Sequence, residues 1–196
     1  MRKRNQTFPP KLAQTLTWLL AVGAASFLTA CSSTHIRGDR TAAGASASPC
    51  RNIMVVALDD RAEIRTQFES DLVYFLQQRK VAAVGNAKQF TLSDFTGGAE
   101  QIKQTFATAR TEAVLCVRTT DRSTFERGPG YELSAGLGEI ETAVQLQATL
   151  YRLSDGMPIW NGVISTILKD QYNSRVVLKG VARDIVSSLA KDKVVP

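Results

Sequence analysis

Hydrophobic and polar residues alternate with two different periods along the chain. Before about residue 110, apolar residues recur at helical intervals of three and four between short apolar runs, whereas residues 140–153 alternate one by one. Residues 52–58, NIMVVAL, form a short apolar run rich in β-branched side chains, which is typical of a strand buried on both faces. Residues 61–79 then carry apolar side chains at intervals of three and four, which predicts one buried face of a helix. Residues 81–85, VAAVG, predict a second short strand. The chain therefore begins its folded part with a strand-helix-strand unit.

A second helix and a third strand follow before the period changes. Apolar residues within 102–109 share one helical side, and residues 113–120, AVLCVRTT, predict the third strand. Residues 140–153 then alternate strictly between apolar and polar, as expected of an antiparallel strand with one wet face. After a Ser-Asp-Gly turn, residues 158–168 predict its hairpin partner. Residues 177–189 predict a third amphipathic helix.

These elements assemble in one economical way. Right-handed crossovers place the first three strands in a parallel core in the order two, one, three, and the hairpin extends the sheet on one side. We therefore predict a single α/β domain over residues 51–196. It has a mixed sheet of about five strands, made of a parallel β-α-β-α-β core plus an antiparallel hairpin, with three helices. At 196 residues the chain is long enough for one such domain and appendages.

The first thirty residues differ from the rest in charge and hydropathy. They hold four of the 24 basic residues and none of the 18 acidic ones, which leaves 20 basic against 18 acidic residues in the remainder. The net charge of +6 therefore does not indicate nucleic-acid binding. A positive start followed by an apolar stretch predicts a signal peptide over residues 1–30. The competing interpretation is a transmembrane helix, which needs roughly 20 predominantly apolar residues, and Gln14, Thr15 and Thr17 dilute the start of this one.

The segment ends in Leu28-Thr29-Ala30-Cys31, which resembles the lipobox of bacterial lipoproteins. The resemblance implies cleavage between Ala30 and Cys31, alkylation of the Cys31 thiol with diacylglycerol, and acylation of the new amino terminus with a fatty acid such as palmitate. Each buried methylene is worth about 0.8 kcal/mol, so two or more chains give a stable membrane anchor. Ser32 follows the cysteine, and by the same resemblance the absence of Asp there implies the periplasmic face of the outer membrane of a Gram-negative cell.

Residues 31–50 are poor in bulky apolar side chains and predict a lipidated, flexible tether. Treated as a random coil, residues 32–49 would span about 20 to 25 Å. His35 is the only histidine of the chain and falls in this tether. The folded domain is therefore expected to hold no Ser-His-Asp triad and no histidine-rich metal site, and we predict no cofactor, no metal and no enzymatic activity.

The strand ends offer the one candidate ligand site. Asp59 closes the first strand and Thr120 the third, and ligands bind at the carboxyl ends of parallel strands. Asp59 and Asp60, with Asp121 further on, also resemble the acidic residues of a two-component receiver domain, but the hairpin occupies the length that a receiver needs for two more strand-helix units. The simpler interpretation is that Asp60 caps the following helix, with Glu63 completing a capping box.

Cys50 and Cys116 remain after Cys31 is lipidated. Parallel pairing of the first and third strands places Cys116 opposite the middle of the first strand, whereas Cys50 precedes that strand. The mismatch exceeds the roughly 7 Å limit on the Cα separation of a disulfide, so we predict two thiols, with Cys116 buried.

Residues 127–139 lack the spacing of a phosphate-binding loop and predict a flexible connection, in which Tyr131 and Leu133 are candidate contacts for a partner.

Residues 51–192 as a whole resemble a group of uncharacterised bacterial envelope lipoproteins, similar to the N-terminal α/β domain of the periplasmic propeller protein of the Tol-Pal system. The similarity rests on NIMVVALDDRAEIRTQFESDLVYFLQQRKVAAV, LCVRTT, ATLYRLSDGMPIWNG and VARDIVSSLAKDKVV. It implies an envelope adaptor or assembly factor that is held at the membrane by its lipid and binds another envelope protein. A periplasmic small-ligand-binding domain that uses the strand ends near Asp59 and Thr120 is the alternative.

Overall fold

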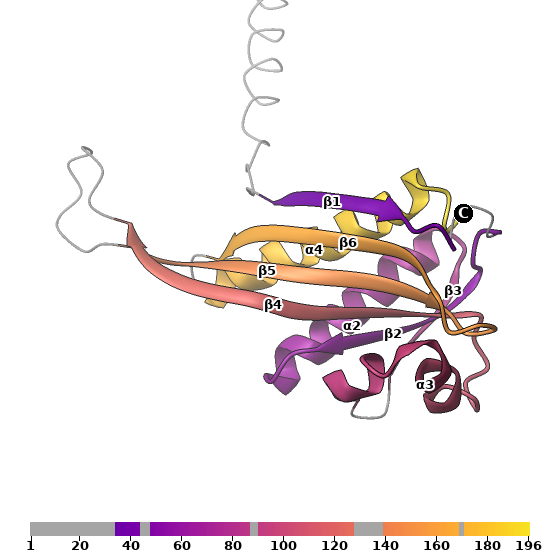
Figure 1. Cartoon of the computed structure of the whole chain (residues 1–196). Helices are drawn as coiled ribbons and strands as arrows, with labels where there is room; N and C mark the ends of the chain where they lie inside the picture. Colours follow the sequence, from indigo (N-terminus) through magenta and orange to yellow (C-terminus); the bar gives the residue numbers. More distant parts are fainter. Residues whose placement is uncertain (1–33, 44–47, 87–89, 128–138, 169–170) are drawn as a thin grey trace, which may run out of the picture. The chain divides into compact units, whose positions relative to one another are not determined.

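A computed structural model describes residues 34–43, 48–86, 90–127, 139–168 and 171–196. They build one mixed sheet with helices on both of its faces (Figure 1). The elements are β1 (His35–Arg40), β2 (Asn52–Leu58), α2 (Ala62–Gln78), β3 (Ala82–Gly85), the 3-10 helix η2 (Leu92–Phe95), α3 (Gly98–Thr105), β4 (Ala113–Arg127), β5 (Glu139–Arg152), β6 (Pro158–Leu168) and α4 (Gln171–Lys191). Within the described residues, no helix has the length and hydropathy to cross a membrane.

The strands lie in the order β1-β6-β5-β4-β2-β3. Strand β2 pairs in parallel with β3 and β4, and the other neighbours are antiparallel. This confirms the predicted parallel core, in which the first strand of the core lies between the other two, and the hairpin at its side. Gly156 in the turn of that hairpin has a φ of +69°, a conformation that glycine adopts without strain. The predicted count of about five strands is corrected to six, because β1 adds an edge strand.

Strand β1 overturns the prediction that residues 31–50 are a flexible tether and that the domain begins at residue 51. It pairs with β6 from His35, opposite Ser165, to Arg40, opposite Trp160. Ile36 is the single bulky apolar residue of β1, and it packs against the core. The local sequence pattern alone therefore does not predict a strand here. The strand is held in the sheet by its pairing with β6, so the folded domain includes residues 35–40.

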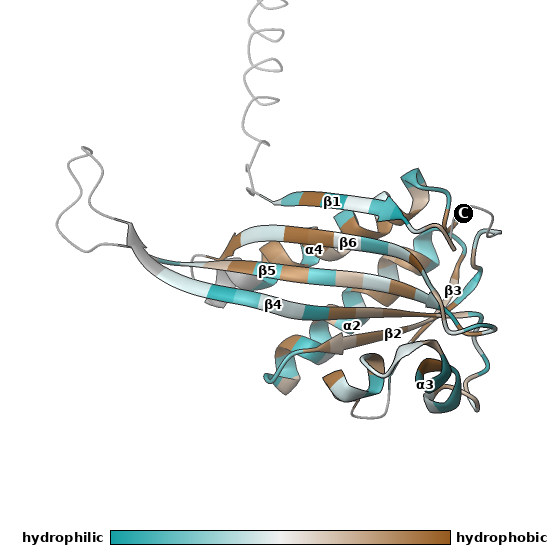
Figure 2. Cartoon of the chain, viewed as in Figure 1, coloured by the Kyte–Doolittle hydropathy of each residue, from teal (hydrophilic) through white to brown (hydrophobic). Residues whose placement is uncertain are grey.

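Helices α2 and α4 pack on one face of the sheet, where they build the larger core. Leu72 and Leu76 of α2, with Ile185 and Leu189 of α4, are fully buried there, each worth about 1.5 to 3 kcal/mol of burial free energy. Helix α3 and η2 cover the other face over β2 and the first half of β4. The remainder of that face, on β5, β6 and β1, is mostly polar (Figure 2), and Val163 of β6 is exposed on it.

Trp160 joins α4 to the edge of the sheet. Its side chain is fully buried, and its Nε1 donates a hydrogen bond to Asp192 Oδ2 at 2.7 Å. The indole lies against Gly38 and Gly162, which face each other across β1 and β6. A Cβ at Gly38 would stand 2.5 Å from a ring carbon, so the two glycines provide the room that the indole needs. Trp160 is thus a core residue.

The two cysteines of the described domain are free and buried. Cys116 pairs with Val56 in the middle of β2, as predicted from the strand order. Cys50 belongs to the core under α2 and α4, whereas Cys116 belongs to the cluster under α3. The sheet itself therefore separates the two thiols.

Candidate functional site

Asp59 and Thr120 line one open pocket of about 380 Å³, as predicted, but Thr120 does not close its strand, because β4 continues to Arg127. Asp59 and Asp60 follow β2, and Thr120, Asp121 and Arg122 come from β4. A register shift between Thr119 and Asp121, in the pairing of β4 with β5, lies beside them. The pocket brings Asp59, at the carboxyl end of β2, together with Thr120 in the middle of β4.

The Asp59 carboxylate is already engaged by two arginines. Its Oδ1 accepts from Arg61 Nε at 3.1 Å, and its Oδ2 accepts from Arg122 Nη2 at 3.2 Å. Burial alone would raise the pKa of Asp59, but the hydrogen bonds from Arg61 and the charges of Arg61 and Arg122 outweigh it and hold the pKa below its ordinary value. Asp59 is thus an ion-paired carboxylate, and a ligand at this pocket has to compete with its arginines.

The start of α2 differs from the predicted capping box. The N-cap residue is Arg61, which makes no side-chain capping bond, and Asp59 Oδ1 accepts from the Arg61 N–H at 2.9 Å. The Asp60–Glu63 capping box is therefore wrong, because the helix begins one residue later than it requires. A capping box occurs instead at η2, where Thr91 and Asp94 exchange the two bonds.

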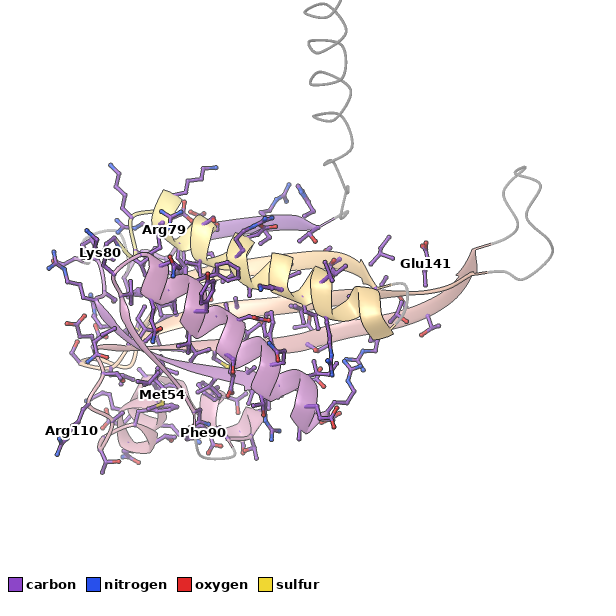
Figure 3. The ribbon with its side chains drawn as sticks, turned by 180° about the vertical axis from the view of Figure 1, so that it is seen from behind. Met54, Arg79, Lys80, Phe90, Arg110 and Glu141 are labelled. Carbon is purple, nitrogen blue, oxygen red and sulfur yellow. The ribbon has the colours of Figure 1, made fainter. Side chains whose placement is uncertain are left out.

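A larger groove lies between α2 and α4. The two helices lie close together at their C-terminal ends and diverge toward their N-terminal ends (Figure 3). A cavity of about 870 Å³ opens along the first three turns of α2 and reaches Arg175 and Leu178 of α4. Ile64, Phe68 and Leu178 supply its apolar walls. We call this cavity the α2–α4 groove.

Asp71 lines the α2–α4 groove and is its most unusual residue. It is only 9% exposed, and its carboxylate makes no hydrogen bond or ion pair with any residue in the described part of the chain. Asp71 was not predicted as a site residue, because the apolar residues of α2 indicate the buried face of the helix without it. The signal was present, since Asp71 stands seven residues after Ile64 and three after Phe68, on the same helical face.

His35 lies inside the domain, contrary to the prediction that it belongs to a tether. It is exposed on β1, opposite Ser165 of β6. No hydrogen bond joins its imidazole to another residue of the described ranges. Among the described residues, no group of three or more His, Cys, Asp or Glu side chains is arranged to hold a metal ion.

Four predicted site residues lie outside the described residues. They are Ala30 and Cys31 at the lipobox, and Tyr131 and Leu133 in the connection between β4 and β5. Lipidation, cleavage and these partner contacts stay predictions.

Comparison with known proteins finds similar solved structures, each at low sequence identity. No family model matches it, and no curated protein matches its sequence. Among solved structures it is similar to the PelC dodecamer from Paraburkholderia phytofirmans, at 14% identity and a TM-score of 0.47, covering 83% of this chain and 99% of that one. Lipoprotein GNA1162 from Neisseria meningitidis is 15% identical, with a TM-score of 0.46 and coverage of 71% and 97%. A minor lipoprotein from Acinetobacter baumannii is 9% identical, with a TM-score of 0.39 and coverage of 73% and 94%. The resemblance to the Tol-Pal propeller protein stays a prediction.

Proposed function

We propose that this chain is a lipoprotein of the bacterial outer membrane whose domain faces the periplasm. It binds another envelope protein as an adaptor or assembly factor and catalyses no reaction. The observation that carries the proposal is the position of Cys31, which ends a positively charged and then apolar segment with the residues Leu28-Thr29-Ala30 before it.

The folded domain begins only a few residues after the proposed anchor at Cys31. Residues 32–34 separate Cys31 from the start of β1 at His35. At no more than about 3.6 Å per residue, the Cα atoms of Cys31 and His35 lie within about 14 Å of each other. The lipid therefore holds the domain much closer to the membrane surface than a tether of eighteen residues would.

The α2–α4 groove supports the binding role. It is a large cavity with apolar walls and a few polar groups, which is the usual composition of a binding site. A groove that is open along a helix suits a segment of another protein.

The lipid anchor is tested by labelling cells with radioactive palmitate and by intact-mass measurement of the purified protein. We expect label and the mass of a diacylglyceryl, acylated Cys31 in the wild type. Cys31→Ala should leave an uncleaved precursor without label, whereas Cys116→Ala keeps both label and cleavage. Palmitate on the Cys31→Ala chain would contradict the proposal. Ser32→Asp should in turn move the labelled protein from the outer to the inner membrane fraction.

Small-ligand binding at the strand-end pocket is a second candidate function. The meeting of Asp59, Thr120 and Arg122 in one pocket favours it. A ligand there competes with Arg61 and Arg122 for Asp59, so Asp59→Asn should change its affinity at least several-fold. Thr120→Val removes a pocket hydroxyl that does not line the α2–α4 groove, so it should weaken ligand binding and leave partner binding through the groove unchanged, which separates the two functions.

A further inference from the structure

The α2–α4 groove contains a carboxylate that the described fold leaves unpaired. Asp71 is more than nine-tenths buried, lines the groove and has no hydrogen-bond or ion-pair partner among the described residues. Taking an ionised carboxylate out of water costs free energy unless a cation or a set of donors compensates it. Neither oxygen of Asp71 is among the fully buried atoms without a partner, so the carboxylate reaches the cavity, where the low exposure of the residue leaves it only partly hydrated.

The other charges of the groove leave Asp71 available. Arg61 is held by Asp59 through its Nε at 3.1 Å. Glu63 is acidic and exposed, and Arg175 is exposed on α4 without an ion pair among the described residues. The charged groups of the groove without an ion pair among the described residues are thus Glu63, Asp71 and Arg175. Of these three, only Asp71 is buried.

The apolar walls lie beside the carboxylate on the same helix. Phe68 is one turn before Asp71, and Ile64 is about 10 Å before it along the axis, at 1.5 Å per residue. A ligand that satisfies both features needs a cation next to an apolar group. Lysine and arginine in an apolar sequence have this chemistry, because their stems pack on apolar surface while the charge reaches a carboxylate.

We propose that the α2–α4 groove binds a segment of the partner envelope protein in which a lysine or arginine stands beside apolar residues. The cation pairs with Asp71, and the apolar neighbours contact Ile64, Phe68 and Leu178. This inference rests on the proposed function and names the chemistry of its partner. The competing arrangement is an internal pair between Asp71 and Arg175.

Stability separates the two arrangements. Asp71→Asn keeps the size of the side chain and removes a buried charge, so an unpaired Asp71 predicts a thermal midpoint that rises by about 2 °C or more. Glu100→Gln is the matched control, an acid-to-amide change on α3 at an exposed ion pair with Lys103, and should leave the midpoint nearly unchanged. An unchanged or lower midpoint for Asp71→Asn overturns the proposal. So does strong coupling between Asp71→Asn and Arg175→Gln in a double-mutant cycle.

Binding is tested on the full-length lipoprotein in detergent micelles with ¹³C-labelled isoleucine methyl groups. The probe is the peptide acetyl-Leu-Lys-Leu-amide, with glutamate and norleucine in place of lysine as sign and neutral controls. We expect a saturable shift of the Ile64 methyl with the lysine peptide alone, and no shift of Ile102, which lies in the cluster under α3. Asp71→Asn should weaken the binding about ten-fold, and Glu100→Gln should not.

Equal binding of the three peptides, or unchanged binding to Asp71→Asn, overturns the proposal. These outcomes are independent of the lipid anchor. Palmitate on Cys31 together with a failed titration leaves an anchored lipoprotein that binds its partner elsewhere. A successful titration without palmitate retains the groove and removes the anchor.

Discussion

Glu69 connects helix α2 to the end of strand β2 through a hydrogen bond. Substitutions of Glu69 can distinguish the contribution of this hydrogen bond to stability from the cost of the buried charge. Strand β3 ends at Gly85, opposite Val55, so β2 continues beyond its neighbour. There Glu69 Oε1 accepts a hydrogen bond from the N–H of Ala57 at 2.9 Å, and the backbone of Asn86 donates to the same carboxylate. The Glu69 side chain thus takes the place of a strand at this point.

The size of the effect follows from burial. Glu69 is 7% exposed and Ala57 is 4% exposed. Glu69→Ala leaves buried N–H groups without an acceptor, which costs about 1 to 3 kcal/mol of unfolding free energy. For a domain of about 150 to 250 residues, this lowers the thermal midpoint by about 2 to 4 °C per kcal/mol. Glu69→Gln keeps an oxygen that accepts the bond from Ala57 and removes the charge.

The pH dependence has a defined sign. Burial raises the pKa of Glu69 above its ordinary value of 4.5 by more than the hydrogen bonds from Ala57 and Asn86 and the charge of Arg65 lower it. The folded state therefore holds this proton more tightly than the unfolded state. The contribution of Glu69 to stability is full below pH 4.5 and decreases as the pH rises through the folded-state pKa. Glutamine lacks this loss, so the stability of Glu69→Gln relative to the wild type increases over the same window.

Urea unfolding of the wild type and both variants at pH 4 and pH 7.5 measures these quantities. We expect Glu69→Ala to be the least stable at both values, and Glu69→Gln to match or exceed the wild type at pH 7.5. The reasoning is refuted if Glu69→Gln loses as much stability as Glu69→Ala. It is also refuted if the difference between Glu69→Gln and the wild type does not grow from pH 4 to pH 7.5.

Two further predictions concern the glycines and the thiols. Gly38→Ala places a Cβ 2.5 Å from the Trp160 ring and 2.7 Å from Ser188 Oγ, and should lower stability by about 1 to 3 kcal/mol in urea unfolding. Gly180→Ala, in α4 with open space around the new Cβ, should raise it by about 0.5 to 1 kcal/mol, so equal effects would contradict the packing argument. Burial raises the pKa of Cys50 to about 11 and of Cys116 to about 12, so a disulfide reagent at pH 8 should label neither in the folded Cys31→Ala chain and both in urea. Rapid labelling of the folded chain would show that a thiol is accessible.

The central sheet could be predicted because the local sequence of its strands is typical of strands. The β-branched run of β2 and the strict alternation of β5 each predict a strand from local pattern alone, and the crossover rule then gives the order of the parallel strands. The same rule placed Cys116 opposite the middle of β2, which the pairing with Val56 confirms.

The elements that were missed depend on contacts between distant residues. Strand β1 has one bulky apolar residue, Ile36, and is held by pairing with β6, which no local pattern encodes. The boundary of α2 moved by one residue because Asp59 binds the Arg61 N–H, and a capping motif leaves such alternatives open. The α2–α4 groove depends on how two helices diverge, and helical periodicity gives the buried face of each helix without the angle between them.

Strand β1 also has a mechanical role if the chain is held at Cys31. Tension on the anchor enters the domain at His35, the first residue of an edge strand. A pull along the strand loads the six register pairs with β6 together, whereas a pull away from the sheet opens them one after another from His35. The far end is fastened by the hydrogen bond from Arg40 to the Lys193 carbonyl, at 2.7 Å. The pairing between β1 and β6 then lies in the path of any force between the anchor and the rest of the domain, and its opening would lengthen the connection without detaching the domain.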